Sequence, residues 1–318
     1  MPAELLSGVF APVLTPFKAD LSIDKPAHVL FCKWLLANNA GLAVFGTNSE
    51  ANSLSAGERL ELLDALVSAG IPGSRLMPGT GTCALPDTVI LTRAALAAGA
   101  AAVLMLPPFF YKTVSEDGVF ASYAEVIERI GDSRLRICLY HIPKISGVPI
   151  GLPLIDRLLA RYPGTIAGLK DSSGDIANTL SVLREHPQLR VFCGSETLLL
   201  ETMRHGGAGC ISACANVNPA AIARLCRDWR LPEAEDLQSR LNPVRAVFES
   251  QPMIAALKAA AAEYGKYPSF ANVRPPLDRF DAGRKNALVS MLAAIGFAMP
   301  GLAGHLGSTS GLPMAMAE

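Results

Sequence analysis

The chain has 318 residues, of which 50% are hydrophobic and 18% are charged, and its 28 basic and 28 acidic side chains give a formal net charge of zero. An average soluble domain carries roughly 25% charged residues, so this composition favours either a large core or a surface buried against copies of the chain. The zero net charge and the lack of basic runs exclude nucleic acid as a partner.

Short apolar runs alternate with longer amphipathic stretches along the chain. Because the runs are continuously apolar, they are typical of strands that are covered on both faces of a parallel sheet. The predicted strands are 8–17, 41–46, 75–81, 101–108, 136–143, 165–170, 191–194 and 209–213. Segments of helical composition, such as 56–70 and 85–99, separate them.

Eight predicted strands, each followed by a helix, within about 230 residues indicate an α/β fold of the (β/α)8 TIM-barrel type. A doubly wound open sheet is the competing architecture, and the number of strands favours the barrel. Three regions follow: a barrel at 1–231, a C-terminal helical extension at 232–299 and a flexible tail at 300–318. The helices predicted in the extension are 233–249, 252–264 and 283–297.

Targeting, membrane and metal signals are not found in the sequence. The first ten residues lack the basic and apolar regions of a signal peptide. Residues 94–106 are too short to cross a membrane, and glycine and proline interrupt 287–304. The seven scattered cysteines show no metal or disulfide spacing, which is typical of reduced, buried thiols. We therefore expect a cytoplasmic protein without membrane partner or bound metal.

Lys170 stands out because it ends an apolar run, TIAGLK, where a barrel strand would open onto the active-site face. A lysine amine is a nucleophile only when unprotonated, and apolar surroundings disfavour the protonated form. Such an amine attacks a ketone to form a Schiff base, which permits bond cleavage or loss of water without a metal or organic cofactor. The alternative is a lysine whose stem packs on the barrel rim while its amine stays in water.

Two companions of Lys170 are consistent with this chemistry. Tyr140 ends the fifth predicted strand, where a phenol would transfer protons between the amine and the substrate oxygen. The turn FGTNSEA at 45–51 offers Thr47 and Asn48, whose backbone N–H groups would bind the carboxylate of a 2-oxo acid. The alternatives are an ordinary rim tyrosine and a plain loop between a strand and a helix.

Five segments then occur in a set order and spacing: GTNSEANSLS, LPPFFYK, LYHIPKISGVPI, GLKDSSGD and GCISACANVNP. They resemble the dihydrodipicolinate synthase / N-acetylneuraminate lyase family, and the resemblance runs from about residue 6 to residue 297. It implies a (β/α)8 barrel with a helical C-terminal region, usually a homotetramer, that binds pyruvate or a related 2-oxo acid as a Schiff base.

The resemblance also implies roles for four residues. Lys170 corresponds to the Schiff-base lysine and Tyr140 to the tyrosine that relays protons. The carboxylate-binding loop of the family is usually GTTGE or GSTGE and is GTNSE here, so Thr47 keeps its role and Asn48 replaces a second hydroxyl.

Further substrate contacts are implied for four more residues. The backbone of Cys210 falls where the family contacts the 2-oxo acid. Ser172, Glu196 and Ser212 fall near the place where neuraminate lyases bind the polyol end of a sugar acid. Glu50 is expected to anchor its loop.

Two departures from the family pattern bear on the substrate and the mechanism. In dihydrodipicolinate synthases the tyrosine is typically followed by an arginine, and this arginine binds the carboxylate of the second substrate. Ile145 takes the position of the arginine here. Loss of an arginine that donates hydrogen bonds to a carboxylate weakens binding by on the order of 2–5 kcal/mol. The adjacent Lys144 is expected to point elsewhere. Many members also carry paired tyrosines where this chain has Phe109 and Phe110. Either water or His141 takes over that proton transfer, or the reaction needs fewer proton transfers.

The sequence therefore predicts a Schiff-base lyase, an aldolase or dehydratase, that acts on a 3-deoxy-2-oxo sugar acid or a hydroxylated 2-oxo acid. Two alternatives stay open: 4-hydroxy-tetrahydrodipicolinate (dihydrodipicolinate) synthase itself, and a non-catalytic barrel that binds 2-oxo acids. The substrate itself is not fixed, because a family resemblance carries over the fold better than the specificity.

Overall fold

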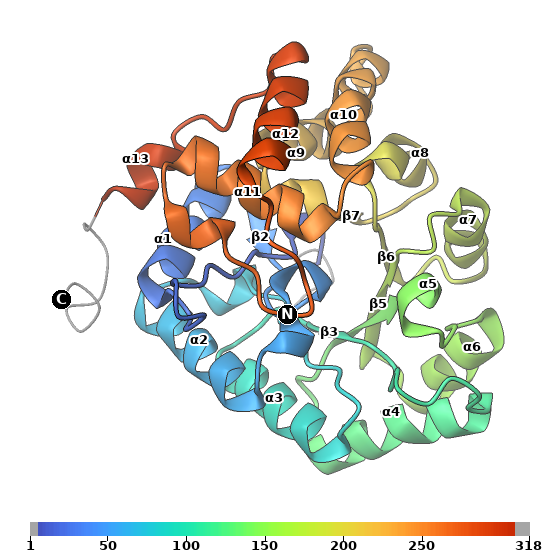
Figure 1. Ribbon diagram of the computed structural model, residues 1–318. Helices are drawn as coiled ribbons and strands as arrows, with labels where there is room; N and C mark the ends of the chain where they lie inside the picture. The colour runs from blue at the N-terminus through green and yellow to red at the C-terminus, as the bar shows by residue number, and fades with distance from the viewer. Residues whose placement is uncertain (1–5, 309–318) are drawn as a thin grey trace.

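The computed structural model describes residues 6–308, and within them seven parallel strands form one sheet in the order β2-β1-β7-β6-β5-β4-β3 (Figure 1). The strands are β1 (Gly8–Ala11), β2 (Ala40–Leu42), β3 (Val103–Met105), β4 (Ile137–His141), β5 (Ile166–Asp171), β6 (Arg190–Cys193) and β7 (Gly209–Ile211). Each lies within a predicted strand or within one residue of it, so the predicted α/β fold with a parallel sheet is confirmed.

The remaining predicted strand, 75–81, is not a regular strand, but its backbone lies between the two edges of the sheet. Met77 N–H donates to the carbonyl of Leu42, the last residue of β2, at 2.8 Å, and Thr80 N–H donates to the Leu104 carbonyl on β3 at 3.1 Å. Backbone hydrogen bonds therefore continue from one edge strand of the sheet to the other.

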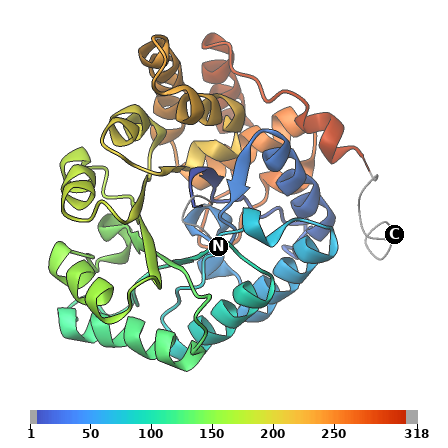
Figure 2. The ribbon, with the colours of Figure 1, turned by 180° about the vertical axis from the view of Figure 1, so that it is seen from behind.

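Helices surround the strands, as the views from both ends show (Figures 1 and 2). In chain order they are α1 (Lys25–Ala37), α2 (Ala56–Ser68), α3 (Leu85–Ala97), α4 (Glu116–Ile130), α5 (Pro143–Ser146), α6 (Leu152–Arg161), α7 (Ile176–Glu185), α8 (Leu199–Arg204) and α9 (Pro219–Asp228). Local signals set their ends: Ser55 and Glu58 form a reciprocal capping box that starts α2, and Gly131, with φ of 62°, ends α4.

The chain after α9 continues with α10 (Ala234–Glu249), α11 (Met253–Gly265) and α12 (Ala282–Ala294). The flexible tail predicted from residue 300 is wrong for its first residues, because α13 (Leu302–Leu306) packs against the fold. Leu302 and Leu306 are buried, and the Trp34 indole donates to the Pro300 carbonyl at 3.0 Å. The rest of that predicted tail, 309–318, lies outside the described residues.

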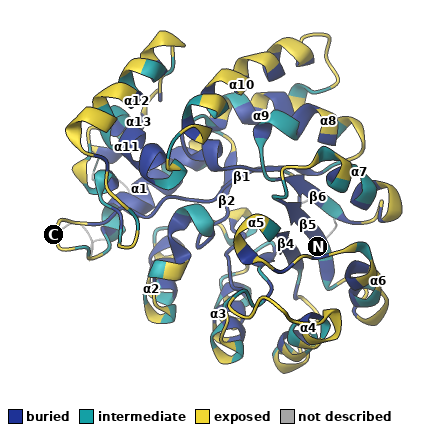
Figure 3. Cartoon of the chain, turned by 45° about the vertical axis from the view of Figure 1, so that its right-hand side comes forward, coloured by how far each residue is buried: buried dark blue, intermediate teal, exposed yellow. Residues whose placement is uncertain are grey.

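Successive side chains of a strand point alternately toward the outer helices and toward the space enclosed by the strands. Figure 3 shows the strands as buried residues at the centre of the molecule. On β4, Ile137 and Leu139 pack toward the outer helices, whereas Cys138 and Tyr140 join Phe192 in the cluster enclosed by the strands. This alternation decides which residues at the strand ends face the interior.

Two other expectations concern cysteines and membrane spans. All seven cysteines are free thiols, and six are buried as predicted, whereas Cys83 is exposed. In the described part of the chain, no helix has the length and apolar character that a membrane crossing requires.

His28 on α1 makes stability depend on pH. Its side chain is fully buried, and burial lowers its pKa to about 4, with a smaller opposing effect from the Leu14 backbone. Between pH 6.5 and 4 the unfolded chain binds a proton at this position that the folded chain does not, so stability present above pH 6.5 is lost as the pH falls. At about 1.4 kcal/mol per pH unit between the two pKa values, the loss is about 3 kcal/mol.

We therefore expect wild type to lose about 3 kcal/mol more unfolding free energy than His28→Leu between pH 7 and pH 4. Urea denaturation of both proteins at the two pH values measures this difference. Equal losses in the two proteins would show that His28 does not carry the pH dependence.

Candidate active site

Lys170 and Tyr140 lie side by side at the ends of neighbouring strands. β4 and β5 pair in parallel with Tyr140 directly opposite Lys170, so both side chains leave the sheet on the same face. Both are 3% exposed, and Lys170 Nζ lies 4.1 Å from the centre of the Tyr140 ring. Within residues 6–308 the amine has no hydrogen-bond or ion-pair partner.

The Tyr140 hydroxyl connects this pair to the loop after β2. Tyr140 Oη and Thr47 Oγ1 lie 3.1 Å apart, within hydrogen-bonding distance. Thr47 opens the 3-10 helix η2 (Thr47–Ser49), and in the described structure the backbone N–H groups of Thr47 and Asn48 form no hydrogen bond. Two free N–H groups at the start of a helical turn are suited to an anion such as a carboxylate.

Glu50 fixes the shape of this loop, as the sequence predicted. It adopts a left-handed conformation with φ of 57°, which is uncommon for residues other than glycine. Its carboxylate pairs with the buried Lys258 of α11 and accepts the Arg274 N–H at 2.9 Å. The C-terminal helical region therefore holds the loop that presents Thr47 and Asn48.

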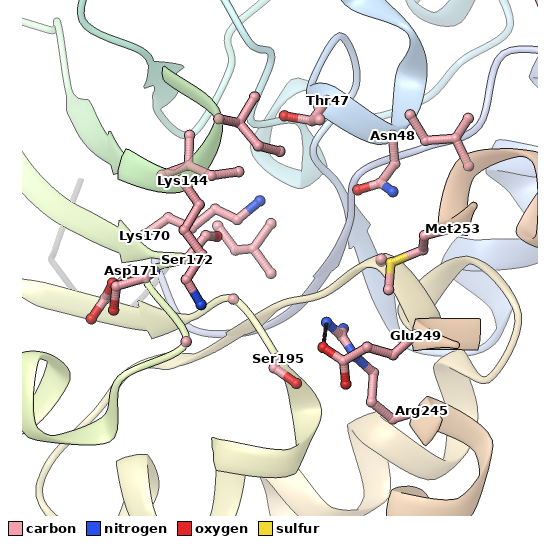
Figure 4. Close-up of a pocket in the computed structure, with 18 of the residues that line it drawn as sticks. Thr47, Asn48, Lys144, Lys170, Asp171, Ser172, Ser195, Arg245, Glu249 and Met253 are labelled. Atoms are coloured by element: carbon pink, nitrogen blue, oxygen red, sulfur yellow. Dashed lines mark hydrogen bonds and ion pairs between the residues drawn. The ribbon is translucent and has the colours of Figure 1, made fainter. Parts of the chain in front are cut away.

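A cavity of about 620 Å³ opens above these residues (Figure 4). Loops at the carboxyl ends of the strands line one part of it, and the C-terminal helices α10 and α11 line another. Its polar and apolar walls include Thr47, Asn48, Tyr140, Lys144, Ile145, Lys170, Ser172, Ser195, Ile211, Arg245, Glu249 and Met253. The structure thus brings together five predicted site residues: Lys170, Tyr140, Thr47, Asn48 and Ser172.

The other three predicted contacts do not line the cavity. Cys210 is buried in the core between the sheet and the helices, and the next residue, Ile211, reaches the cavity because strand residues alternate in direction. Ser212 donates to the carboxylate of Glu196, which is 1% exposed and ion-pairs with Arg245 at 3.5 Å. Glu196 and Ser212 therefore support the cavity wall from behind.

The comparisons with known proteins give the family. Residues 5–295 match the model of the dihydrodipicolinate synthetase family. The chain belongs to this family. Its members are lyases of the class I aldolase type, and the present protein is therefore a lyase.

Several relatives resemble the chain over most of its length. A DapA-like lyase from Chloroflexus aurantiacus is 35% identical over 85% of this chain and 90% of its own. The putative 2-dehydro-3-deoxy-D-gluconate aldolase YagE from Escherichia coli is 29% identical over 91% and 97%. Its crystal structure in complex with pyruvate has a TM-score of 0.82 at 26% identity and covers 92% and 100% of the two chains.

One solved structure carries the synthase name. The crystal structure of dihydrodipicolinate synthase from Agrobacterium tumefaciens has a TM-score of 0.84 and 30% identity, with 91% of this chain and 99% of that chain covered. A protein named as an aldolase and one named as a synthase therefore both resemble this lyase. The two names imply different substrates, so the residues that line the cavity carry the information about the substrate.

Lys144 corrects a prediction about this cavity. It was expected to point elsewhere, but it lines the cavity together with Ile145, which is 63% exposed. Both lie on the single helical turn of α5, where successive side chains are about 100° apart and both reach the rim. Within the described residues Lys144 has no hydrogen-bond or ion-pair partner.

His141 does not fill the place of the missing relay tyrosine. Its Nδ1 accepts the Ile150 N–H at 3.0 Å, and the ring does not line the cavity. Burial lowers its pKa, and nearby Asp171 opposes this in part, so the ring favours the neutral form. Phe110 and Tyr111 are also outside the cavity and are 72% and 71% exposed.

The surroundings of Lys170 offer neither a reactive thiol nor a cluster of metal-binding side chains within the described residues. Cys138 lies in the core enclosed by the strands, and burial raises the pKa of its thiol to about 12, with nearby Lys170 opposing this in part. The thiol therefore stays protonated and is a poor nucleophile. Within the described residues, no group of three or more acidic, histidine or cysteine side chains is arranged to hold a metal ion.

The buried Lys258–Glu50 pair predicts a large stability effect. Lys258→Met leaves Glu50 buried without its lysine partner and should lower the unfolding free energy by about 3–5 kcal/mol. Adding Glu50→Gln removes the uncompensated charge and should recover most of that loss. Lys266→Met is the control, because its pair with Glu263 lies at the surface and should contribute at most about 1 kcal/mol.

Denaturant unfolding of the three variants and wild type gives these values. A double variant as unstable as Lys258→Met alone would show that lost packing, rather than the unpaired carboxylate, causes the effect.

Proposed function

We propose that the protein is a Schiff-base-forming aldolase or dehydratase that acts on a 2-oxo acid. The observation that supports this most directly is the buried, unpaired Lys170 amine beside the Tyr140 phenol, at the floor of a cavity. The free N–H groups of Thr47 and Asn48 bind the substrate carboxylate, which brings the adjacent carbonyl carbon to Lys170.

The proposed reaction begins when Lys170 Nζ attacks C2 of the 2-oxo acid and the carbonyl oxygen leaves as water. In aldol cleavage, Tyr140 accepts the proton of the C4 hydroxyl, the C3–C4 bond breaks, and its electrons move through C3 to the imine nitrogen. In dehydration, a proton passes from C3 through Tyr140 to the C4 hydroxyl, so that the enamine formed at C2–C3 expels this group as water. Protonation of the resulting carbon skeleton and hydrolysis then release the 2-oxo product and Lys170.

Tyr140 is suited to the proton steps because its hydroxyl has a second hydroxyl within reach. Thr47 Oγ1 lies 3.1 Å away and can accept or return the phenol proton. The exposed Phe110 cannot contribute a proton, so we propose that Tyr140 and Thr47 carry the transfer with water from the open cavity.

The relatives support the 2-oxo acid as the substrate class. YagE is named a putative 2-dehydro-3-deoxy-D-gluconate aldolase, and its structure was determined with pyruvate. By analogy we propose a 3-deoxy-2-oxo sugar acid or a hydroxylated 2-oxo acid as the substrate here. Analogy carries the reaction type further than the identity of the substrate.

The second candidate function is 4-hydroxy-tetrahydrodipicolinate synthase. Ile145 speaks against it because an alkyl side chain cannot bind a carboxylate. The cavity position of Lys144 speaks for it, because an unpaired ammonium beside Ile145 is able to bind one. The third candidate, a barrel that binds 2-oxo acids without turnover, has its main support in the missing tyrosine pair.

The proposal includes the setting of the enzyme. We propose a (β/α)8 barrel at 1–231 with a helical extension at 232–299, which works in the cytoplasm without a cofactor. We also propose a homotetramer, since Phe110, Tyr111 and Val114 form an exposed apolar segment before α4 that another copy would cover.

Trapping tests the central role of Lys170. Incubation with pyruvate and borohydride should add the mass of one reduced adduct at Lys170, because reduction converts the imine into a stable secondary amine. Peptide mass spectrometry locates the adduct, and Lys170→Met should abolish it. Adduct formation on another lysine, or none on wild type, would refute the proposed chemistry.

Turnover tests Tyr140 separately. We expect Tyr140→Phe to lower kcat for cleavage or dehydration by about 10²–10⁴, because the phenol no longer transfers a proton. Following pyruvate release or water loss across a panel of 2-oxo sugar acids gives the rates. Undiminished turnover would remove Tyr140 from the mechanism, and pyruvate binding without turnover of any substrate would favour the non-catalytic barrel.

The synthase alternative has its own assay. Wild type should not condense pyruvate with aspartate semialdehyde at an appreciable rate, because Ile145 cannot bind the second carboxylate. A coupled assay for the cyclic product measures this. Efficient condensation that disappears in Lys144→Met would establish the synthase instead.

A further inference from the structure

A charged pair on α10 faces the cavity and has no part in the proposed steps. Arg245 and Glu249 lie one helical turn apart, both line the cavity, and Arg245 Nη2 donates to Glu249 Oε1 at 3.3 Å. Figure 4 shows this pair on a different side of the cavity from Lys170. Pyruvate is far smaller than a cavity of about 620 Å³, so a longer substrate has room to reach the pair.

The pair is built into the fold from behind. The side chain of Arg245 is 11% exposed, and its Nη1 lies 3.5 Å from the carboxylate of the buried Glu196. Ser212 donates to that carboxylate, and Gln238 of α10 donates to the Glu196 carbonyl at 3.0 Å. In the part of the chain that the structure describes, Oε1 of Glu196 and Nε of Arg245 lack a hydrogen-bond partner. One acceptor and one donor of this network are therefore not used by the protein itself.

The charges at this end of the cavity add up to an excess of one negative charge. A single guanidinium faces two carboxylates, those of Glu196 and Glu249. Burial alone would lower the pKa of Arg245, but the charges of Glu196 and Glu249 outweigh it and raise the pKa, so the guanidinium stays charged. A second carboxylate on the substrate would meet the carboxylate of Glu249 directly, and the buried Glu196 behind the wall already offsets the charge of Arg245. Hydroxyl groups, in contrast, can donate to Glu249 and accept from Arg245.

We propose that Arg245 and Glu249 bind neighbouring hydroxyl groups at the end of the substrate remote from the 2-oxo group. The pair thereby selects 3-deoxy-2-oxo acids whose chain ends in alcohols over those that end in a second carboxylate. This inference rests on the proposed Schiff-base function and adds a specificity-determining pair from the C-terminal helices. Lys144, the unpaired cation on another part of the rim, is the group that would favour the opposite selection.

Two substrates of equal chain length provide the test: a six-carbon 3-deoxy-2-oxo acid that ends in a primary alcohol, and its counterpart that ends in a carboxylate. We expect the kcat/KM of wild type to be at least about tenfold higher for the alcohol-ended substrate. Its hydroxyl groups can form hydrogen bonds with Arg245 and Glu249, whereas the terminal carboxylate is repelled by Glu249. Glu249→Gln should narrow this ratio at least about fivefold, because it removes the excess negative charge and frees Arg245.

Asp236→Asn is the matched control for the charge change. Asp236 lies on the same helix in a comparable pair with Arg240, four residues apart, and neither residue lines the cavity. The ratio should stay at its wild-type value in this variant. Arg245→Met should lower kcat/KM for the alcohol-ended substrate by about 10–100-fold, and formation of the pyruvate adduct at Lys170 shows whether that variant keeps its fold.

The outcomes separate this inference from the proposed function. A wild-type preference for the carboxylate-ended substrate, above all one that Lys144→Met removes, would overturn it. An unchanged ratio in Glu249→Gln would also overturn it. Failure to trap pyruvate at Lys170 in wild type refutes the Schiff-base function instead, whereas trapping without discrimination between the two substrates refutes only the role of the α10 pair.

Discussion

The register between β4 and β5 places Tyr140 opposite Lys170, and the rest of the site is arranged around that pair. The ladder shifts by one residue near its start, where Ile137 pairs with Ile166 but Cys138 pairs with Gly168. Because side chains alternate along a strand, this single extra residue decides that Lys170, and not its neighbour, faces the enclosed core together with Tyr140. An amine buried against a phenol ring, without a carboxylate partner, is the result.

The helices after α9 take part in the site as well as covering the fold. Lys258 of α11 and the backbone of Arg274 hold Glu50, which in turn shapes the loop that carries Thr47 and Asn48. On the other side of the cavity, α10 brings in Arg245 with its buried partner Glu196. In the proposed function, residues at the strand ends therefore bind the reacting end of the substrate, and residues of the helical region bind its remote end.

The parts of the site that follow from strand topology were predictable from the sequence. Lys170, Tyr140 and Thr47 each follow or end an apolar run, and the carboxyl ends of parallel strands meet on one face. Choices that depend on side-chain direction were not: Lys144 was expected to point away from the cavity that it lines.

Arg245 and α13 were missed for a different reason. Arg245 lies in a helix whose sequence carries no motif, and it becomes part of the site only through the way α10 docks on the strand-end loops. The short α13 is likewise held by tertiary contacts, such as the hydrogen bond from Trp34 to the Pro300 carbonyl. The local sequence does not predict such contacts. Docking of this kind depends on contacts between residues that are far apart in the chain.

A crystal structure of the enzyme soaked with pyruvate tests the central claim most directly. The account predicts continuous density from Lys170 Nζ to C2 of the ligand, with the ligand carboxylate on the N–H groups of Thr47 and Asn48 and the Tyr140 hydroxyl near the new bond. Pyruvate bound without a covalent link, or attached to a different lysine away from Tyr140, would contradict it.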